Sequence, residues 1–526
     1  MKMRLISAFI LLLAMSVTSQ RLAAASSDEI RQPAVSGSFY PQDPKELAAA
    51  VDGMIARAVV PQTQDHIVAL IAPHAGYPYS GAVAAHSYAL LKGLKIHRVV
   101  VIAPSHFEEF PFASVYDGSA YATPLGKVPV DKVFARKLAG MSPLIKLSSR
   151  GHVPSPGRAE HSLEVELPFL QRTLSDFEVV PIVMGEQSYE ASRALGVGLA
   201  ELIQGSDTLI VASSDLSHYH PYDEASTLDH KTLHAISEWD YLTLSRNFQM
   251  RIWEACGGGP IVAAMIAAER LGATRANLLK YANTGDVTGD HSRVVGYGAV
   301  ALLQTANHRV VEGPRFSLSR AEKQRLLDIA RRAVETAVKE NKVIEVPADL
   351  SQPLTQDRGA FVTIRKNGEL RGCVGYTGSI KPLALTVRDV AILAALRDTR
   401  FPPVTVRELP QLKYEVSVLS PMRRIFDTKQ IRVGEHGLLM KNGPNEGILL
   451  PQVASDEGWD RKTFLEQTAV KAGLPASAWR DKDTDIFFFT ALVFGEPAAP
   501  AVTPEEPLPQ KPPSRPGDRV PNLPPR

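Results

Sequence analysis

Three histidines occupy the same place in a repeated sequence pattern, shortly after an apolar run. His74 follows residues 67–72, His106 follows residues 98–103, and His218 follows residues 208–213. Imidazole binds transition metals and exchanges protons near neutral pH, so each ring is a candidate for either task. A single histidine of this kind is more often a hydrogen-bonded turn residue, but three in the same place predict a functional site.

Cys256 adds a group with matching chemistry. It lies in the turn 254–260, where the glycines after the thiol let the backbone approach a ligand closely. Two imidazoles and one thiolate favour iron, copper or zinc over magnesium or calcium, and they leave a coordination position open. Zinc would suit hydrolysis, whereas iron or copper would suit oxygen or redox chemistry. His74, His106 and Cys256 are therefore the predicted metal ligands.

Asp215 and His218 both come directly after the third apolar run. Their spacing suits an acid/base pair beside the ion, or a carboxylate that orients a neighbouring ligand. A different assignment makes Cys256 a nucleophile with His218 and Asp215 as partners. A third treats Cys256 as a buried structural thiol, the common role of a free cysteine. Metal binding is favoured because it accounts for the shared placement of the histidines.

The apolar runs must form neighbouring strands if these side chains are to meet. Each run is rich in β-branched residues and too short for an ordinary helix, which is typical of a parallel strand buried on both faces. Side chains just past the carboxyl ends of such strands share one crevice in an open sheet. Because helical segments alternate with the strands, we predict an α/β domain over residues 31–304, with helices on both faces of the sheet.

The pattern changes after a linker at residues 305–317. Ser319 and Glu322 form a capping box at the head of an amphipathic helix, and Asn367–Gly368 predicts a hairpin turn. The further expected elements are helices near 382–398 and 462–472, strands at 414–419 and 487–494, and a hairpin around 441–447. Together they predict a smaller α+β domain over residues 318–496. The stretch 142–158 is expected to be a surface loop.

Both ends of the chain have special compositions. Lys2 and Arg4 precede an apolar stretch and a small-residue cleavage pattern, so residues 1–25 are predicted to be a cleavable signal peptide. We therefore expect a periplasmic or secreted protein that is not held in the membrane after cleavage. The last segment, 497–526, has 11 prolines among 30 residues and is expected to be disordered or polyproline II.

Charge and cysteine content narrow the class of protein. Of the 526 residues, 44% are hydrophobic and 22% are charged, and the net charge of +2 gives no reason to expect a nucleic-acid partner. A chain of 526 residues is too long to fold around a single hydrophobic core, so two domains are expected. Its only cysteines, Cys256 and Cys373, fall in different predicted domains, which argues against a disulfide.

Several segments resemble the Memo-like protein family over roughly residues 31–303. They are PHAGYPYSG (73–81), APSH (103–106), EHSLEVELPFLQ (160–171), SSDLSHYHPYDEA (213–225) and NTGDVTGD (283–290). That family is similar in fold to the class III extradiol dioxygenases, which hold non-haem iron with two histidines and a carboxylate. The resemblance implies His74, His106 and Cys256 as metal ligands, with Asp215 and His218 lining the site. Because a thiolate replaces the carboxylate, it implies copper as readily as iron, and zinc less so.

The second domain resembles the AMMECR-type domain through LRGCVG (370–375) and RDTRFPP (397–403). The two domains together resemble a fusion of proteins A and B of the AmmeMemoRadiSam system. That resemblance implies a radical S-adenosylmethionine protein as a partner.

These observations predict a metal-dependent oxidoreductase that acts on a small phenolic substrate. In this prediction His218 moves protons and Asp215 supports it. The alternative is a module without turnover, which binds copper, iron or a peptide while the AMMECR-type domain recruits partners.

Overall fold

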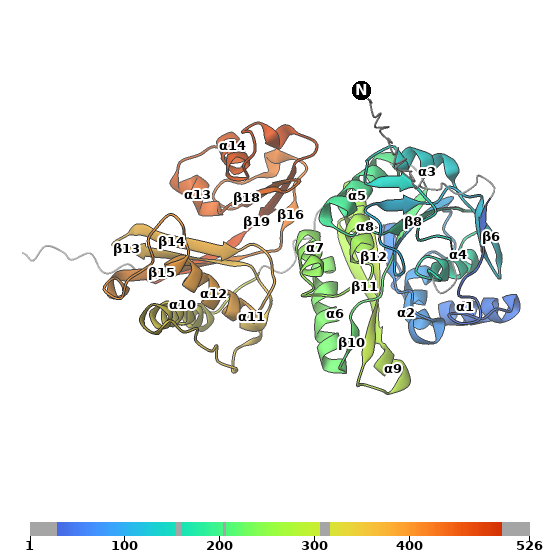
Figure 1. Ribbon diagram of the computed structural model, residues 1–526, viewed down its shortest axis with the longest axis horizontal. Helices are drawn as coiled ribbons and strands as arrows, with labels where there is room; N and C mark the ends of the chain where they lie inside the picture. Colours follow the sequence, from blue (N-terminus) through green and yellow to red (C-terminus); the bar gives the residue numbers. More distant parts are fainter. Residues whose placement is uncertain (1–28, 154–158, 204–206, 306–315, 497–526) are drawn as a thin grey trace, which may run out of the picture.

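A computed structural model describes residues 29–153, 159–203, 207–305 and 316–496. The predicted signal peptide and the predicted proline-rich tail lie outside these residues, as does most of the predicted linker. Figure 1 shows two bodies of mixed helix and strand, one from each half of the chain. None of the described helices is both long enough and apolar enough to cross a membrane.

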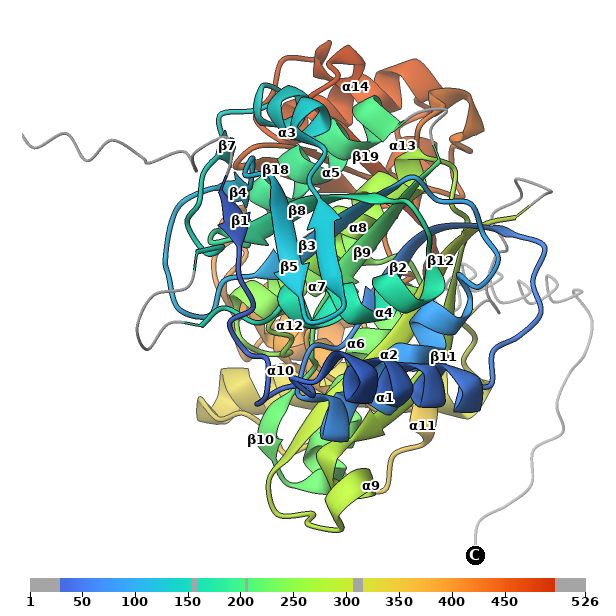
Figure 2. The same ribbon diagram turned by 90° about the vertical axis from the view of Figure 1, so that its right-hand side faces the viewer.

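The first body is built on a mixed sheet of nine strands. Its order is β10-β12-β2-β9-β3-β8-β4-β7, with β11 paired to β12. The strands β2 (His66–Ala72), β9 (Thr208–Ser213) and β3 (Arg98–Pro104) are parallel neighbours at its centre (Figure 2). The predicted α/β architecture is confirmed, and the runs expected to carry the histidines end side by side.

Alternate residues of the central strands enter two separate apolar clusters. On β3, Val99 and Val101 belong to one cluster, while Val100 and Ile102 belong to the other. The helices α1 (Pro44–Arg57), α2 (Tyr77–Ala89) and α4 (Leu167–Thr173) cover the first face, and α5 (Tyr189–Ile203) and α8 (Gly258–Arg270) cover the second. This two-sided burial explains why the runs are apolar throughout rather than alternating.

The remaining elements of this body frame the central strands. They are β1 (Ile30–Arg31), β4 (Ala113–Val115), β5 (Ala120–Thr123), β6 (Gly126–Pro129), α3 (Lys132–Ala139), β7 (Ile145–Leu147), η1 (Glu164–Glu166), β8 (Glu178–Met184), β10 (His218–His220), α6 (Tyr222–Ser237), α7 (Tyr241–Gln249), β11 (Arg275–Asn283), α9 (Thr284–Thr288) and β12 (Val294–Gln304). The expected loop at 142–158 contains β7, and neither α7 nor β11 was predicted.

The second body contains two four-stranded sheets. The first has the order β14-β13-β15-β20 and the second β16-β19-β17-β18. Its elements are α10 (Arg320–Glu340), α11 (Gln352–Thr355), β13 (Ala360–Lys366), β14 (Glu369–Tyr376), α12 (Leu383–Leu396), η2 (Leu409–Gln411), β15 (Leu412–Leu419), β16 (Arg423–Arg424), η3 (Thr428–Gln430), β17 (Gly437–Asn442), β18 (Asn445–Leu449), α13 (Pro451–Asp456), α14 (Arg461–Lys471), η4 (Ala478–Arg480), β19 (Asp485–Phe489) and β20 (Ala491–Gly495). The capping box of Ser319 and Glu322 is present.

The prediction of a single strand at residues 487–494 is wrong. The chain there forms β19 and β20, which belong to different sheets. Thr490 lies between them and exchanges two hydrogen bonds with Ser420, its backbone N–H reaching the Ser420 hydroxyl at 2.9 Å. The apolar run continues across the junction, because the residues on both sides of it pack into a core. Periodicity therefore gave no sign of the break.

The two bodies share one apolar cluster. Phe487 and Leu439 of the second body pack in the same cluster as Tyr241 and Trp239 of the first, and the rings of Tyr241 and Phe487 lie 5.9 Å apart. The Asp485 carboxylate reaches across to the Arg193 Nε at 2.6 Å. The contact between the bodies is therefore a packed interface with a buried ion pair.

Candidate metal centre

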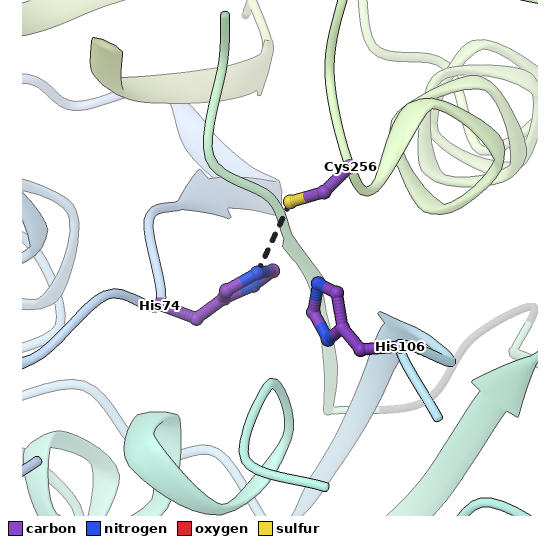
Figure 3. A group of neighbouring side chains, drawn as sticks. All are labelled: His74, His106 and Cys256. Carbon is purple, nitrogen blue, oxygen red and sulfur yellow. Dashed lines mark hydrogen bonds between the residues drawn. The ribbon is translucent and has the colours of Figure 1, made fainter. Parts of the chain in front are cut away.

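His74, His106 and Cys256 meet where the central strands end. His74 follows β2, His106 follows β3, and Cys256 stands before α8, and one ligand atom from each lies within 4.8 Å of the others. The Cys256 Sγ is 3.1 Å from the His74 Nε2. Figure 3 shows the three side chains pointing toward one another. Residues far apart in the sequence thus present two nitrogens and one sulfur to a common point.

A glycine allows the cysteine turn to reach the strand ends. A Cβ on Gly257 would lie 2.3 Å from the carbonyl oxygen of Ser213, the last residue of β9. The Gly257 N–H instead donates to the Ser214 hydroxyl at 2.9 Å. Only glycine permits this approach, and it sets Cys256 against the end of the strand between β2 and β3.

The His106 ring is oriented by a carboxylate. Its Nδ1 pairs with the Glu160 Oε1 at 2.9 Å, and its backbone N–H donates to the Glu160 Oε2 at 2.6 Å. The same Oε1 accepts the backbone N–H groups of His161 and Ser162. Glu160 is therefore occupied in holding His106, and the ring's Nε2 is left for an ion.

The His74 ring is oriented through a serine. Its Nδ1 lies 2.7 Å from the Ser213 Oγ, which is also 2.7 Å from the Glu166 Oε1 and 2.6 Å from the Ser162 carbonyl oxygen. Because the Ser162 carbonyl can only accept, the Ser213 proton is donated to it, and the His74 Nδ1 is the donor to Ser213. The lone pair of His74 is then on Nε2, which faces the sulfur.

Burial controls the charge of the ligands. Desolvation lowers the pKa of His74 well below its usual value, and the nearby rings of His106, His161 and His218 lower it further. Burial and the neighbouring Asp215 raise the pKa of the Cys256 thiol. The thiol therefore donates its proton toward the His74 Nε2, and a cation that displaced this proton would meet nitrogen and sulfur lone pairs. The donor set fits a transition-metal ion.

Asp215 contacts both His74 and Cys256. Its backbone N–H donates to the Cys256 Sγ at 3.2 Å, and its Oδ1 accepts the backbone N–H of His74 at 2.8 Å. Burial raises the pKa of this carboxyl to about 7. The predicted site residue is thus present beside the ligands, where it ties the end of β9 to the end of β2.

His218 lies at the wall of a cavity of about 310 Å³. The cavity is also lined by Cys256, Trp253 and Phe248, and Arg251 stands at its exposed rim. Burial lowers the pKa of His218, so its ring is a neutral proton acceptor at physiological pH. Of the predicted site residues, it is the one with both access to a cavity and a suitable protonation state.

His161 is a member of the site that was not predicted. Its ring stacks on His106 with centroids 4.7 Å apart, and it lies 5.6 Å from the His74 ring. It precedes η1 rather than following a strand, so the pattern that revealed the other three histidines did not reveal it. The spacing of Glu160 and His161 in the sequence did not distinguish them from the other polar residues of that segment.

A nucleophilic role for Cys256 is not favoured. The imidazole nearest to the sulfur is His74 rather than His218, and burial raises the thiol pKa. A reactive cysteine needs surroundings that stabilise its thiolate and lower that pKa. Cys256 and Cys373 are both free thiols, as expected.

Two family models match separate parts of the chain. The family model described as Memo-like protein matches residues 31–301, and the AMMECR1 model matches residues 327–494. A MEMO1 family protein of Methanosarcina barkeri is 40% identical over 280 residues, which is 52% of this chain and 100% of the relative. One of Nitrosopumilus maritimus is 35% identical over 279 residues, again 52% and 100%.

Two solved structures are also similar. The uncharacterized protein PH0010 from Pyrococcus horikoshii is 40% identical and covers 34% of this chain and 94% of its own, with a TM-score of 0.34. The uncharacterized protein JW3007 from Escherichia coli K12 is 15% identical and covers 45% of this chain and 100% of its own, with a TM-score of 0.32.

Proposed function

This chain belongs to the Memo-like protein family and also carries an AMMECR1 domain, and we propose that it is a metal-dependent oxidoreductase acting on a small phenolic substrate. The observation that carries the proposal is the convergence of His74, His106 and Cys256. Hydrogen bonds at the Nδ1 atoms of both rings leave their Nε2 atoms for an ion. We propose iron or copper, in keeping with the resemblance to the non-haem iron dioxygenases.

Bound iron or copper would supply redox chemistry and an open coordination position. The chain's own residues provide the rest. His218 accepts the phenol proton, because its buried ring is neutral. Phe248 and Trp253 line the 310 Å³ cavity and pack against an aromatic ring. Asp215 holds the His74 backbone and the Cys256 sulfur in place.

Metal analysis of the natively expressed protein is the first test. We expect one iron or copper ion per chain that survives desalting, and its loss in His74→Ala. The matched control is His86→Ala, because His86 lies on α2 with its Nδ1 bonded to the Ala82 carbonyl and takes no part in the site. A wild type without metal, whose thermal stability does not respond to added iron or copper, would contradict the proposal.

Oxygen consumption with a panel of catechols and phenols is the second test. Turnover that requires the metal and is lost in His74→Ala supports the oxidoreductase. A filled metal site without turnover would instead favour the alternative, a metal-binding or peptide-binding module. A periplasmic or secreted location and a radical S-adenosylmethionine partner stay predictions from the sequence.

A further inference from the structure

A second, larger cavity of about 650 Å³ lies between the two domains. One wall is a single face of α6, with Thr227, Lys231 and Ala235 at four-residue spacing. The opposite wall is α11 and the residues that follow it, up to Arg358. Figure 1 shows α6 and α11 on the facing sides of the two bodies. The site residues His74 and Cys256 do not line this interdomain cavity.

Arg358 presents an unsatisfied guanidinium to the interdomain cavity. One face of the guanidinium lies over the Phe316 ring, 4.0 Å from its centroid. Within the described residues its side chain makes no hydrogen bond and no ion pair, and its Nε is buried without a partner. A buried donor without an acceptor is costly, and stacking leaves the in-plane N–H groups free for a ligand.

Lys231, Asp357 and Asp240 have partners within the described residues, and Glu238 adds a further carboxylate to the cavity wall. The Lys231 Nζ pairs with the Asp357 Oδ2 at 2.8 Å, and the Asp240 Oδ1 accepts the Thr243 backbone N–H at 3.2 Å. Burial lowers the pKa of Arg358, and the negative charges of Glu238 and Asp240 oppose this shift. One cation is thus available among several carboxylates, so a singly charged anion is favoured over a dianion such as phosphate.

We propose that the interdomain cavity binds a small organic monocarboxylate. The guanidinium of Arg358 pairs with the carboxylate in its own plane, a geometry that suits two parallel hydrogen bonds. The apolar part of the ligand lies toward Trp253 and Ala235, which line the same cavity. A volume of about 650 Å³ is within the range of small-molecule sites. This binding is separate from the proposed metal chemistry and requires both domains.

Binding of defined probes to the full chain tests the proposal. Acetate, benzoate and 1-naphthoate are titrated by calorimetry beside their uncharged primary amides. We expect at least one of the carboxylates to bind with a Kd below about 1 mM, and its amide to bind at least about tenfold more weakly. Failure of all three carboxylates to bind, or equal binding of the amide, would overturn the proposal.

Variants then locate the binding. Arg358→Gln should weaken the carboxylate about tenfold to a hundredfold, whereas Arg332→Gln, the same change at an exposed position of α10, should not. Thr227→Trp on the exposed side of α6 should block the cavity without removing any charge. His74→Ala should bind the probe as wild type does, which separates this result from failure of the metal proposal. Equal affinity in wild type, Arg358→Gln and Thr227→Trp would place the probe elsewhere and refute the assignment.

Discussion

Asp215 reaches the sulfur of Cys256 through its backbone N–H, at 3.2 Å, rather than through its carboxylate. The carboxylate accepts the His74 backbone N–H at 2.8 Å, and one of its oxygens lies within 4.8 Å of the sulfur. The end of β9 therefore holds the segments that carry two of the proposed ligands. This arrangement assigns Asp215 to positioning, one of the two roles that its spacing from His218 allowed.

Substitution of Asp215 separates positioning from proton transfer. Asp215→Asn keeps an acceptor for the His74 N–H and should retain metal affinity within about threefold, whereas Asp215→Ala should lose about tenfold to a hundredfold. Competition with a chelator measures both. A carboxylate that transferred protons would make Asp215→Asn as inactive as Asp215→Ala in oxygen consumption, and that outcome would contradict the positioning role.

Substitution of His218 tests proton transfer directly. His218→Gln should lower kcat by about a hundredfold or more while the metal content stays unchanged, because the ring is the proposed base and not a ligand. The control is His220→Gln, because His220 lies on the same short strand, β10, as His218. Its ring pairs with Glu224 and Glu254. Loss of metal from His218→Gln would show instead that this ring is a ligand.

The buried carboxyl of Glu166 makes stability depend on pH. Burial raises the pKa of Glu166 to about 8, so the folded state holds this proton more tightly than the unfolded state. The stabilisation that this proton gives the folded state is fully present below the unfolded pKa of about 4.3, and it is lost as the pH rises to about 8. Glu166→Gln should therefore be more stable than wild type at pH 9, by on the order of 2 kcal/mol, and similar at pH 4.

Urea denaturation of the metal-free protein at the two pH values measures this difference. Glu178→Gln, at an exposed position on β8, should show no such dependence. A Glu166→Gln protein that is destabilised equally at both pH values would mean that the hydrogen bonds of the carboxyl matter more than its ionisation.

The interface between the domains depends on Asp485. Burial would raise the pKa of this carboxyl, but Arg424 and Arg193 lower it below its usual value. Asp485→Ala leaves the Arg424 guanidinium buried without its 2.8 Å partner and should cost about 3 kcal/mol. Calorimetry should show a lower and broader transition than in Asp483→Ala, the neighbouring change that leaves this ion pair intact. Equal melting curves for the two variants would show that the ion pair does not stabilise the interface.

Much of the fold could be predicted because its signals are local. The strands β2, β3 and β9 are apolar throughout, since both of their faces are buried. The capping box before α10 and the Asn367–Gly368 turn depend on neighbouring residues alone. Other elements carried weak signals: β11 is only partly buried along its length, and its polar residues concealed the strand.

The positions of His74, His106 and His218 after apolar runs, and of Cys256 in a glycine-rich turn, were determined by the sequence, because both patterns are visible without coordinates. Only the tertiary structure decided which nitrogen each ring presents, which way Asp215 points, and that His161 and Glu160 join the site. The same holds for the passage of the chain from β19 to β20 and for the cavity that exposes Arg358. These features depend on contacts between segments far apart in the chain, and such contacts leave no periodic trace in the sequence.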